Sequence, residues 1–143
     1  ILVPLDGSPF SMKALRHAYR LAQAVGARVT LFHASPEYPV GVTADGVIYQ
    51  PLTRAEYAKL RKKEANHLFS AAARKATTFG LSVETVHDIA AAPWKAILAT
   101  AKNQRCDVIV MASHGRSGVA ALLLGSETQK VLTHSRLPVL VVH

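Results

Sequence analysis

Cysteine, acidic residues, aromatic residues and long apolar runs are all scarce in this sequence. Its single cysteine, Cys106, excludes an intrachain disulfide and a zinc site built on cysteines, and favours a reducing compartment. The longest apolar stretch, around residues 119–124, is far shorter than the roughly 18 to 20 residues of a membrane-spanning helix. We therefore expect a cytoplasmic protein with no membrane partner.

Nine acidic residues against 17 basic ones give the chain a net charge of +8, which favours an anionic partner. Nucleic acid, a membrane surface and a phosphorylated small molecule all fit that description. With four Phe, four Tyr and one Trp, and with basic residues spread along the chain, the sequence shows no stacking platform for single-stranded nucleic acid. Nucleic acid therefore remains a minor hypothesis.

The length of 143 residues, half of them apolar and 18% charged, predicts one folded domain over residues 1–143 with a single hydrophobic core. The chain opens at Ile1 on a pattern that is already typical of a strand. We expect that further residues precede it.

Strand patterns and helix patterns alternate along the chain. The expected strands are residues 1–5, 28–34, 81–88, 107–112 and 137–142, and the expected helices lie at 9–25, 53–78, from 93 onward, and 126–134. Such alternation predicts an α/β fold with a parallel sheet and helices on both faces. Ligands in such folds bind beyond the carboxyl ends of the strands, so the loops there are the candidate site.

Local signals set the ends of several elements. Ser8 and Pro9 suit the start of a helix, Gly26 ends it, and Pro93 opens another. Residues 35–52 hold three Pro and two Gly without periodicity, which predicts a long excursion used for binding or left mobile. The run at 107–112 is continuously apolar and belongs at the centre of the sheet, whereas the mixed run at 81–88 fits an edge.

A glycine-rich segment follows the strand that ends at Ala112. Gly115 and Gly125 would let backbone amides approach an anion, and Ser126 offers a hydroxyl and the positive end of a helix dipole to a phosphate. The alternative is that the glycines serve turn geometry and Ser126 is only an N-cap. Asp6 follows the first strand and would face the same place if the first and fourth strands are neighbours, where its carboxylate could accept hydrogen bonds from a ribose.

These residues resemble the universal stress protein family over essentially the whole chain. The resemblance lies in the segments Val3–Ser8, Leu31–Ala34, Val108–Ser126 and Pro138–Val142. The ATP-binding branch of that family carries Gly, two residues, Gly, nine residues, Gly and then Ser, Thr or Asn. Gly115, Gly125 and Ser126 match this pattern, whereas Ala112 stands in place of the first glycine; an alanine in ordinary strand conformation would be tolerated there.

The resemblance implies an open, twisted five-stranded sheet of order 3-2-1-4-5 that binds ATP or AMP, with Mg²⁺ held through the phosphates as an option. Asp6 would meet the ribose or base, the backbone near Ala34 the adenine, and the glycine loop with Ser126 and Thr128 the phosphates. The implied nucleotide-binding residues are Pro4, Leu5, Asp6, Ala34, Met111, Ala112, His114, Gly115, Arg116, Gly125, Ser126, Glu127 and Thr128. The last strand would form a homodimer through Leu137, Pro138, Val139, Leu140, Val141 and Val142.

Other chemistry has little support. The seven histidines show no metal-binding spacing, and no nucleophile elbow, phosphate-loop lysine or dinucleotide fingerprint is present. His114 could act on a phosphate or only order its loop, and Cys106 is expected to be buried and inert. Three hypotheses remain: a dimeric nucleotide-binding switch of the stress response with an unknown protein partner, a slow ATPase or phosphoryl or adenylyl transferase, and a nucleotide-free dimerisation module.

Overall fold

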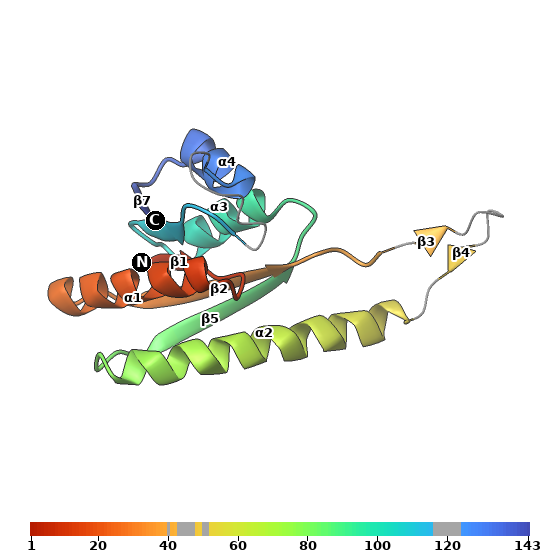
Figure 1. Ribbon diagram of the computed structural model, residues 1–143, viewed down its shortest axis with the longest axis horizontal. Helices are drawn as coiled ribbons and strands as arrows, with labels where there is room; N and C mark the ends of the chain where they lie inside the picture. The colour runs from red at the N-terminus through yellow and green to blue at the C-terminus, as the bar shows by residue number, and fades with distance from the viewer. Residues whose placement is uncertain (40, 43–47, 50–51, 116–123) are drawn as a thin grey trace.

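The computed structural model describes residues 1–39, 41–42, 48–49, 52–115 and 124–143. Its elements form a five-stranded sheet, a separate two-stranded sheet and four helices (Figure 1). They follow in the order β1 (Leu2–Pro4), α1 (Pro9–Val25), β2 (Val29–Ser35), β3 (Gly41–Val42), β4 (Ile48–Tyr49), α2 (Arg54–Thr77), β5 (Val83–Ile89), α3 (Pro93–Asn103), β6 (Ile109–Ala112), α4 (Ser126–His134) and β7 (Val139–Val142).

The large sheet is parallel and has the order β5-β2-β1-β6-β7. This confirms the predicted α/β class and the 3-2-1-4-5 order of its five strands. β1 is the middle strand, and Leu2 is in register with Thr30 of β2 on one side and with Ile109 of β6 on the other. The first and fourth strands of the predicted set are therefore neighbours, as the argument for a shared site at their carboxyl ends required.

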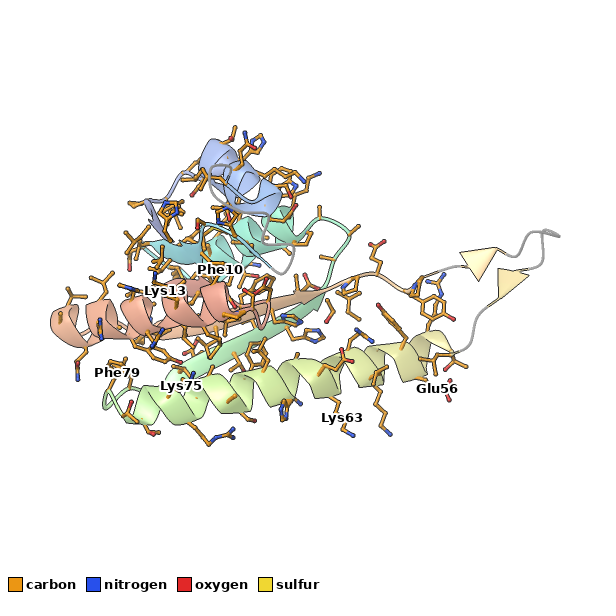
Figure 2. The ribbon with its side chains drawn as sticks, viewed as in Figure 1. Phe10, Lys13, Glu56, Lys63, Lys75 and Phe79 are labelled. Atoms are coloured by element: carbon orange, nitrogen blue, oxygen red, sulfur yellow. The ribbon has the colours of Figure 1, made fainter. Side chains whose placement is uncertain are left out.

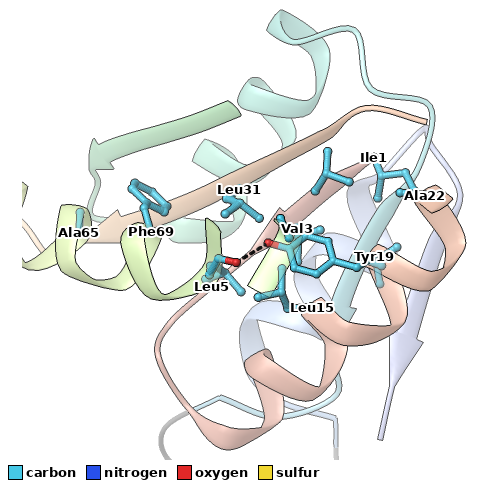
Figure 3. Packing of buried hydrophobic residues seen from close by; sticks show 14 residues of the cluster. Ile1, Val3, Leu5, Leu15, Tyr19, Ala22, Leu31, Ala65 and Phe69 are labelled. Carbon is cyan, nitrogen blue, oxygen red and sulfur yellow. Dashed lines mark hydrogen bonds between the residues drawn. The ribbon is translucent and has the colours of Figure 1, made fainter. Parts of the chain in front are cut away.

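Helices cover both faces of this sheet. α1 and α2 enclose one buried cluster, which includes Val3, Leu31 and Phe69, and α3 and α4 enclose the other around Phe32 and Ile109. In the first cluster the fully buried Tyr19 of α1 donates its hydroxyl to the Ala72 carbonyl of α2 over 3.0 Å (Figure 3). This bond fixes the spacing of the two helices, and burial raises the Tyr19 pKa to about 12.

The helix boundaries follow the local signals. The Ser8 hydroxyl accepts the Ser11 amide at 3.1 Å and caps α1, which ends at Gly26 in left-handed conformation (φ 67°). α2 begins with a reciprocal capping box between Thr53 and Glu56. The bonds from the Thr53 backbone amide and then from its hydroxyl hold the pKa of the exposed Glu56 carboxyl below its ordinary value.

The described residues of the predicted excursion over 35–52 include short strands, and residues 40, 43–47 and 50–51 of it lie outside the described part of the chain. β2 continues through Ser35, and Gly41–Val42 pairs antiparallel with Ile48–Tyr49 beyond the end of the large sheet (Figure 1). Each of these strands spans two residues, which is too short to produce a periodic pattern in the sequence. The Tyr57 hydroxyl of α2 donates to the carbonyls of Pro36 and Glu37 and ties the start of this segment to the helix.

Candidate functional site

The loop after β1 contacts the glycine loop after β6. A Cβ atom added to Gly115 would lie 2.9 Å from Asp6 Oδ2, a separation that side chains do not adopt. The other carboxylate oxygen, Oδ1, accepts the Ser8 amide at 2.9 Å, which orients the Asp6 side chain toward Gly115. The backbone of Gly115 is not left-handed, so a side chain at this position would act on the site through space, by displacing the Asp6 carboxylate. Asp6 and Gly115, predicted to share a site, lie side by side.

A hydrogen bond joins the two ends of the segment between β6 and α4. The Gly125 amide donates to the Ser113 carbonyl at 2.7 Å, and a Cβ at position 125 would lie 3.2 Å from that same oxygen. The Ser113 amide in turn donates to the Val142 carbonyl at 2.8 Å. The end of β6, the start of α4 and the last strand are thus fixed to one another beside Asp6. Arg116 lies outside the described residues.

The amino terminus of α4 carries no side-chain cap. Gly125 occupies the N-cap position and Ser126 is the first helical residue, so the alternative that Ser126 serves as an N-cap is wrong. Ser126 is exposed. The first amides of a helix have no partner within the helix, and with the helix dipole they attract anions. This end of α4 has the electrostatic character that a phosphate requires.

Thr128 and Glu127 use their side chains for structure. The buried Thr128 hydroxyl donates to the Ala112 carbonyl at 2.9 Å and fixes α4 on the end of β6. The Glu127 carboxylate accepts the Trp94 amide at 2.8 Å and pairs with Lys130 at 2.9 Å. Because α3 has no side-chain cap of its own at Ala92, Glu127 caps α3 from the neighbouring helix. The backbone amides of Thr128 and Glu127 lie in the first turn of α4, where they have no partner within the helix and can serve a ligand.

Met111 and Ala112 are strand residues. The buried Met111 packs in the cluster under α3 and α4, and Ala112 is in register with Val142 of β7. Ala112 therefore has extended backbone and does not need the conformational freedom of a glycine. In the other half of the sheet, Pro4 is in register with Phe32, and Ala34 is half-buried beside Asp88.

His33 was missed by sequence reasoning. Its Nδ1 donates to the Leu5 carbonyl at 2.7 Å, which fixes the backbone immediately before Asp6. The His33 ring stacks on that of His87 at 6.0 Å, and the His87 Nε2 bonds the Ser35 hydroxyl at 2.9 Å. Desolvation, followed by repulsion from His33, lowers the His87 pKa. The alternation of side chains along a strand could have indicated this pair, because residues two apart, such as His33 and Ser35, point to the same face of β2.

His114 is ordered by its neighbours. Its Nδ1 lies 2.9 Å from the Ser113 hydroxyl, and its ring packs against Phe10 at 5.9 Å. Its Nε2 is buried and has no hydrogen-bond partner among the described residues. These contacts fit the expected role of ordering the loop, and they place a ring nitrogen next to the Asp6 and Gly115 loops.

The environment of Cys106 differs from the expectation. Cys106, expected to be buried, is half-buried beside a hollow of about 340 Å³ at the amino ends of the strands, although burial does raise its thiol pKa. Within the described ranges, no three His, Cys, Asp or Glu side chains gather as metal ligands. None of the helices in the described part of the chain combines the length and apolar character that crossing a bilayer requires.

The last strand, β7, is an edge of the sheet. The predicted dimer residues Leu137 and Pro138 precede it, and Val139, Leu140, Val141 and Val142 form it. Leu140 is 44% exposed and the other three are half-buried. The outer side of an apolar edge strand is a surface that favours pairing with a partner strand.

The fold and site define an open α/β domain whose loops gather at the carboxyl ends of the central strands. The model of the universal stress protein family matches residues 1–143, and the chain belongs to that family. It is similar to universal stress protein YxiE of Bacillus subtilis, with 34% identity over 144 residues that cover 99% of this chain and 97% of that protein.

Solved structures share the fold. Universal stress protein MJ0577 of Methanocaldococcus jannaschii superposes with a TM-score of 0.82 and 26% identity, covering 99% of this chain and 92% of that one. A universal stress protein in complex with cAMP gives a TM-score of 0.73 and 26% identity, with 99% and 94% covered. For the Archaeoglobus fulgidus universal stress protein in complex with dAMP the TM-score is 0.65 at 20% identity, with 99% and 95% covered, which shows the fold alone.

Proposed function

We propose that this universal stress protein binds an adenine nucleotide, ATP or AMP, at the carboxyl ends of β1 and β6. The observation that carries the proposal is the contact between Asp6 and Gly115 beside the uncapped amino terminus of α4. A carboxylate suited to ribose hydroxyls and a helix end suited to phosphates then lie at one place. The similar structure in complex with cAMP, another adenine nucleotide, supports this choice of ligand.

Each group has a specific role in this proposal. Asp6 accepts hydrogen bonds from the ribose, and the backbone near Ala34 lies against the adenine. Gly115, Gly125 and the first amides of α4 hold the phosphates, with the Ser126 hydroxyl as a further donor. Mg²⁺ that accompanies ATP is held through the phosphates. His33 and Thr128 act through the backbone they fix, at Leu5 and Ala112 respectively.

We further propose that the protein is a cytoplasmic homodimer joined through β7 and acts as a regulatory switch of the stress response. The Ser113 amide bonds the Val142 carbonyl, so the glycine loop and the dimer edge are physically connected. A nucleotide bound at this loop can therefore bias the dimer edge, or the segment over residues 35–52, toward a state that binds a protein partner.

The test is to denature freshly purified protein, identify released nucleotide by mass spectrometry, and titrate the emptied protein with ATP, ADP and AMP by calorimetry. Gly125→Val places carbon against the Ser113 carbonyl and should weaken binding at least about tenfold, or about 1.4 kcal/mol. Ser70→Ala, an exposed serine on α2, is the control and should bind normally. No released nucleotide and no heat of binding would leave a nucleotide-free dimerisation module.

A further inference from the structure

The positive charge of the chain is concentrated on one layer of the fold. α1 and α2 carry ten of the 17 basic residues and two of the nine acidic residues. These two helices therefore hold a formal charge of +8, equal to that of the whole chain. The seven basic and seven acidic residues elsewhere in the sequence cancel. The basic residues of α1 and α2 therefore lie in the same layer of the fold, because both helices pack on one buried cluster.

The basic side chains of this layer, which we call the α1–α2 layer, face solvent. All are exposed except the half-buried Arg61; the ten residues are Lys13, Arg16, Arg20, Arg54, Lys59, Arg61, Lys62, Lys63, Arg74 and Lys75. On α1 the basic positions are spaced at three and four residues, which places them in one stripe. Figure 2 shows Lys13 on α1 and Lys63 and Lys75 on the neighbouring α2.

The two acidic groups of the layer are engaged locally. Glu64 pairs with Arg61 at 2.9 Å, and Glu56 accepts the Thr53 amide and hydroxyl in the cap of α2. They neutralise little of the surrounding charge. Repulsion among so many exposed cations destabilises the folded state unless an anionic partner offsets it.

We propose that the α1–α2 layer binds the phosphate backbone of duplex DNA without sequence preference. α2 has 24 residues and is about 36 Å long, which is close to one helical turn of B-DNA. The large apolar side chains exposed on these two fully described helices are Phe10, Val25 and Leu60, too few and too far apart to form a base-stacking platform or an apolar strip that would enter a bilayer. A duplex, whose phosphates lie outside, needs neither.

α1 begins close to the nucleotide site, because its Phe10 ring packs against His114. Duplex binding and nucleotide binding are measured with different ligands, so the two proposals fail independently. The test is fluorescence anisotropy of a labelled duplex of about 24 base pairs with the full chain, from about 50 to 200 mM NaCl. We expect the logarithm of the binding constant to fall linearly with the logarithm of salt, with a slope near −0.9 for each phosphate neutralised.

Two triple variants distinguish an effect of the α1–α2 layer from an effect of the net charge of the whole chain. Arg16→Gln, Lys59→Gln and Lys63→Gln together remove three charges from the layer and should lower affinity at least about tenfold, with a salt slope shallower by about 2 to 3. Lys95→Gln, Lys102→Gln and Arg136→Gln remove three exposed charges elsewhere and should change affinity less than about twofold. Circular dichroism checks that both variants fold.

Several results would overturn the proposal. These are no binding of the duplex at the lowest salt, equal weakening by the two triple variants, or tighter binding of the single strand than of the duplex. Binding to vesicles containing phosphatidylserine in the absence of duplex binding would assign the layer to a lipid surface instead.

Discussion

Asp6 and Gly115 come from loops more than a hundred residues apart, yet a single methyl group at position 115 would lie 2.9 Å from the Asp6 carboxylate. A side chain at position 115 would therefore act by displacing the Asp6 carboxylate, and not by straining the backbone. This contact joins the carboxyl end of the central strand β1 to the loop after β6. Adding a single methyl group at position 115 therefore tests whether this contact matters for ligand binding.

Gly115→Ala is expected to displace the Asp6 carboxylate and to weaken binding of ATP or AMP by about tenfold or more, about 1.4 kcal/mol, measured by calorimetry. Gly26→Ala is the matched control. Gly26 is left-handed, but a Cβ there meets nothing within 4 Å, so alanine should cost about 1 kcal/mol of fold stability and leave nucleotide affinity unchanged. Equal affinity in the two variants would show that the contact with Asp6 does not matter for binding.

Thr128→Val removes the hydroxyl that joins α4 to the Ala112 carbonyl while keeping nearly the same shape. The free energy of unfolding should fall by about 1 to 2 kcal/mol, because a buried carbonyl loses its partner, and nucleotide affinity should fall with it. Thr133→Val removes an exposed hydroxyl bond within the same helix, to Gln129, and should change both quantities by less than about 0.5 kcal/mol. Urea unfolding with and without AMP measures both effects.

Tyr19→Phe tests the connection between α1 and α2. Loss of the bond to the Ala72 carbonyl should cost about 1 kcal/mol in urea unfolding. Because the folded-state pKa is raised to about 12, this tyrosine stabilises the fold fully below its ordinary pKa of 10, and that contribution is lost as pH rises toward 12. Tyr57→Phe, whose hydroxyl bonds only the carbonyls of Pro36 and Glu37, should cost less. A larger loss of stability in Tyr57→Phe than in Tyr19→Phe would contradict the view that the Tyr19 bond contributes more to the fold.

His87 should make stability depend on pH. Its pKa is lowered in the folded state, first by desolvation and then by His33 and Lys62, with Asp88 acting in the opposite direction. The unfolded chain therefore binds the proton more tightly, so this contribution is complete above about pH 6.5 and is lost as pH falls through the lowered folded pKa. His87→Gln should flatten the decline of stability between about pH 7.5 and pH 5, whereas the exposed His67→Gln should not. If the free energy of unfolding falls with pH as steeply in His87→Gln as in the wild type, the attribution of this pH dependence to His87 is wrong.

The order of the sheet and most helix ends could be predicted because they depend on local signals and on family resemblance. Ser8, Gly26 and Pro93 act on their own neighbours. The apolar run of β6 predicted the centre of the sheet, but the middle strand is β1 and β6 lies beside it, because burial on both faces marks any inner strand. The edge positions of β5 and β7 were likewise expected, and both are confirmed.

The parts that escaped prediction depend on residues distant in the sequence. Glu127 looked like a ligand residue, but its carboxylate caps α3 at Trp94, a contact that exists only once α3 and α4 pack together. His33 looked like one of seven scattered histidines until its bond to the Leu5 carbonyl placed it behind Asp6. The net charge of the α1–α2 layer likewise emerges only when the helices are assigned to faces of the sheet.

The central claim is that Asp6, Gly115 and the start of α4 form one adenine-nucleotide site. The most direct measurement is calorimetric titration of the emptied protein and of Asp6→Asn with AMP and ATP. The account predicts saturable binding with one nucleotide per chain, weakened at least about tenfold by Asp6→Asn, whose amide replaces an acceptor oxygen with a donor. Binding that Asp6→Asn leaves unchanged, or no binding by the wild-type protein, would contradict it.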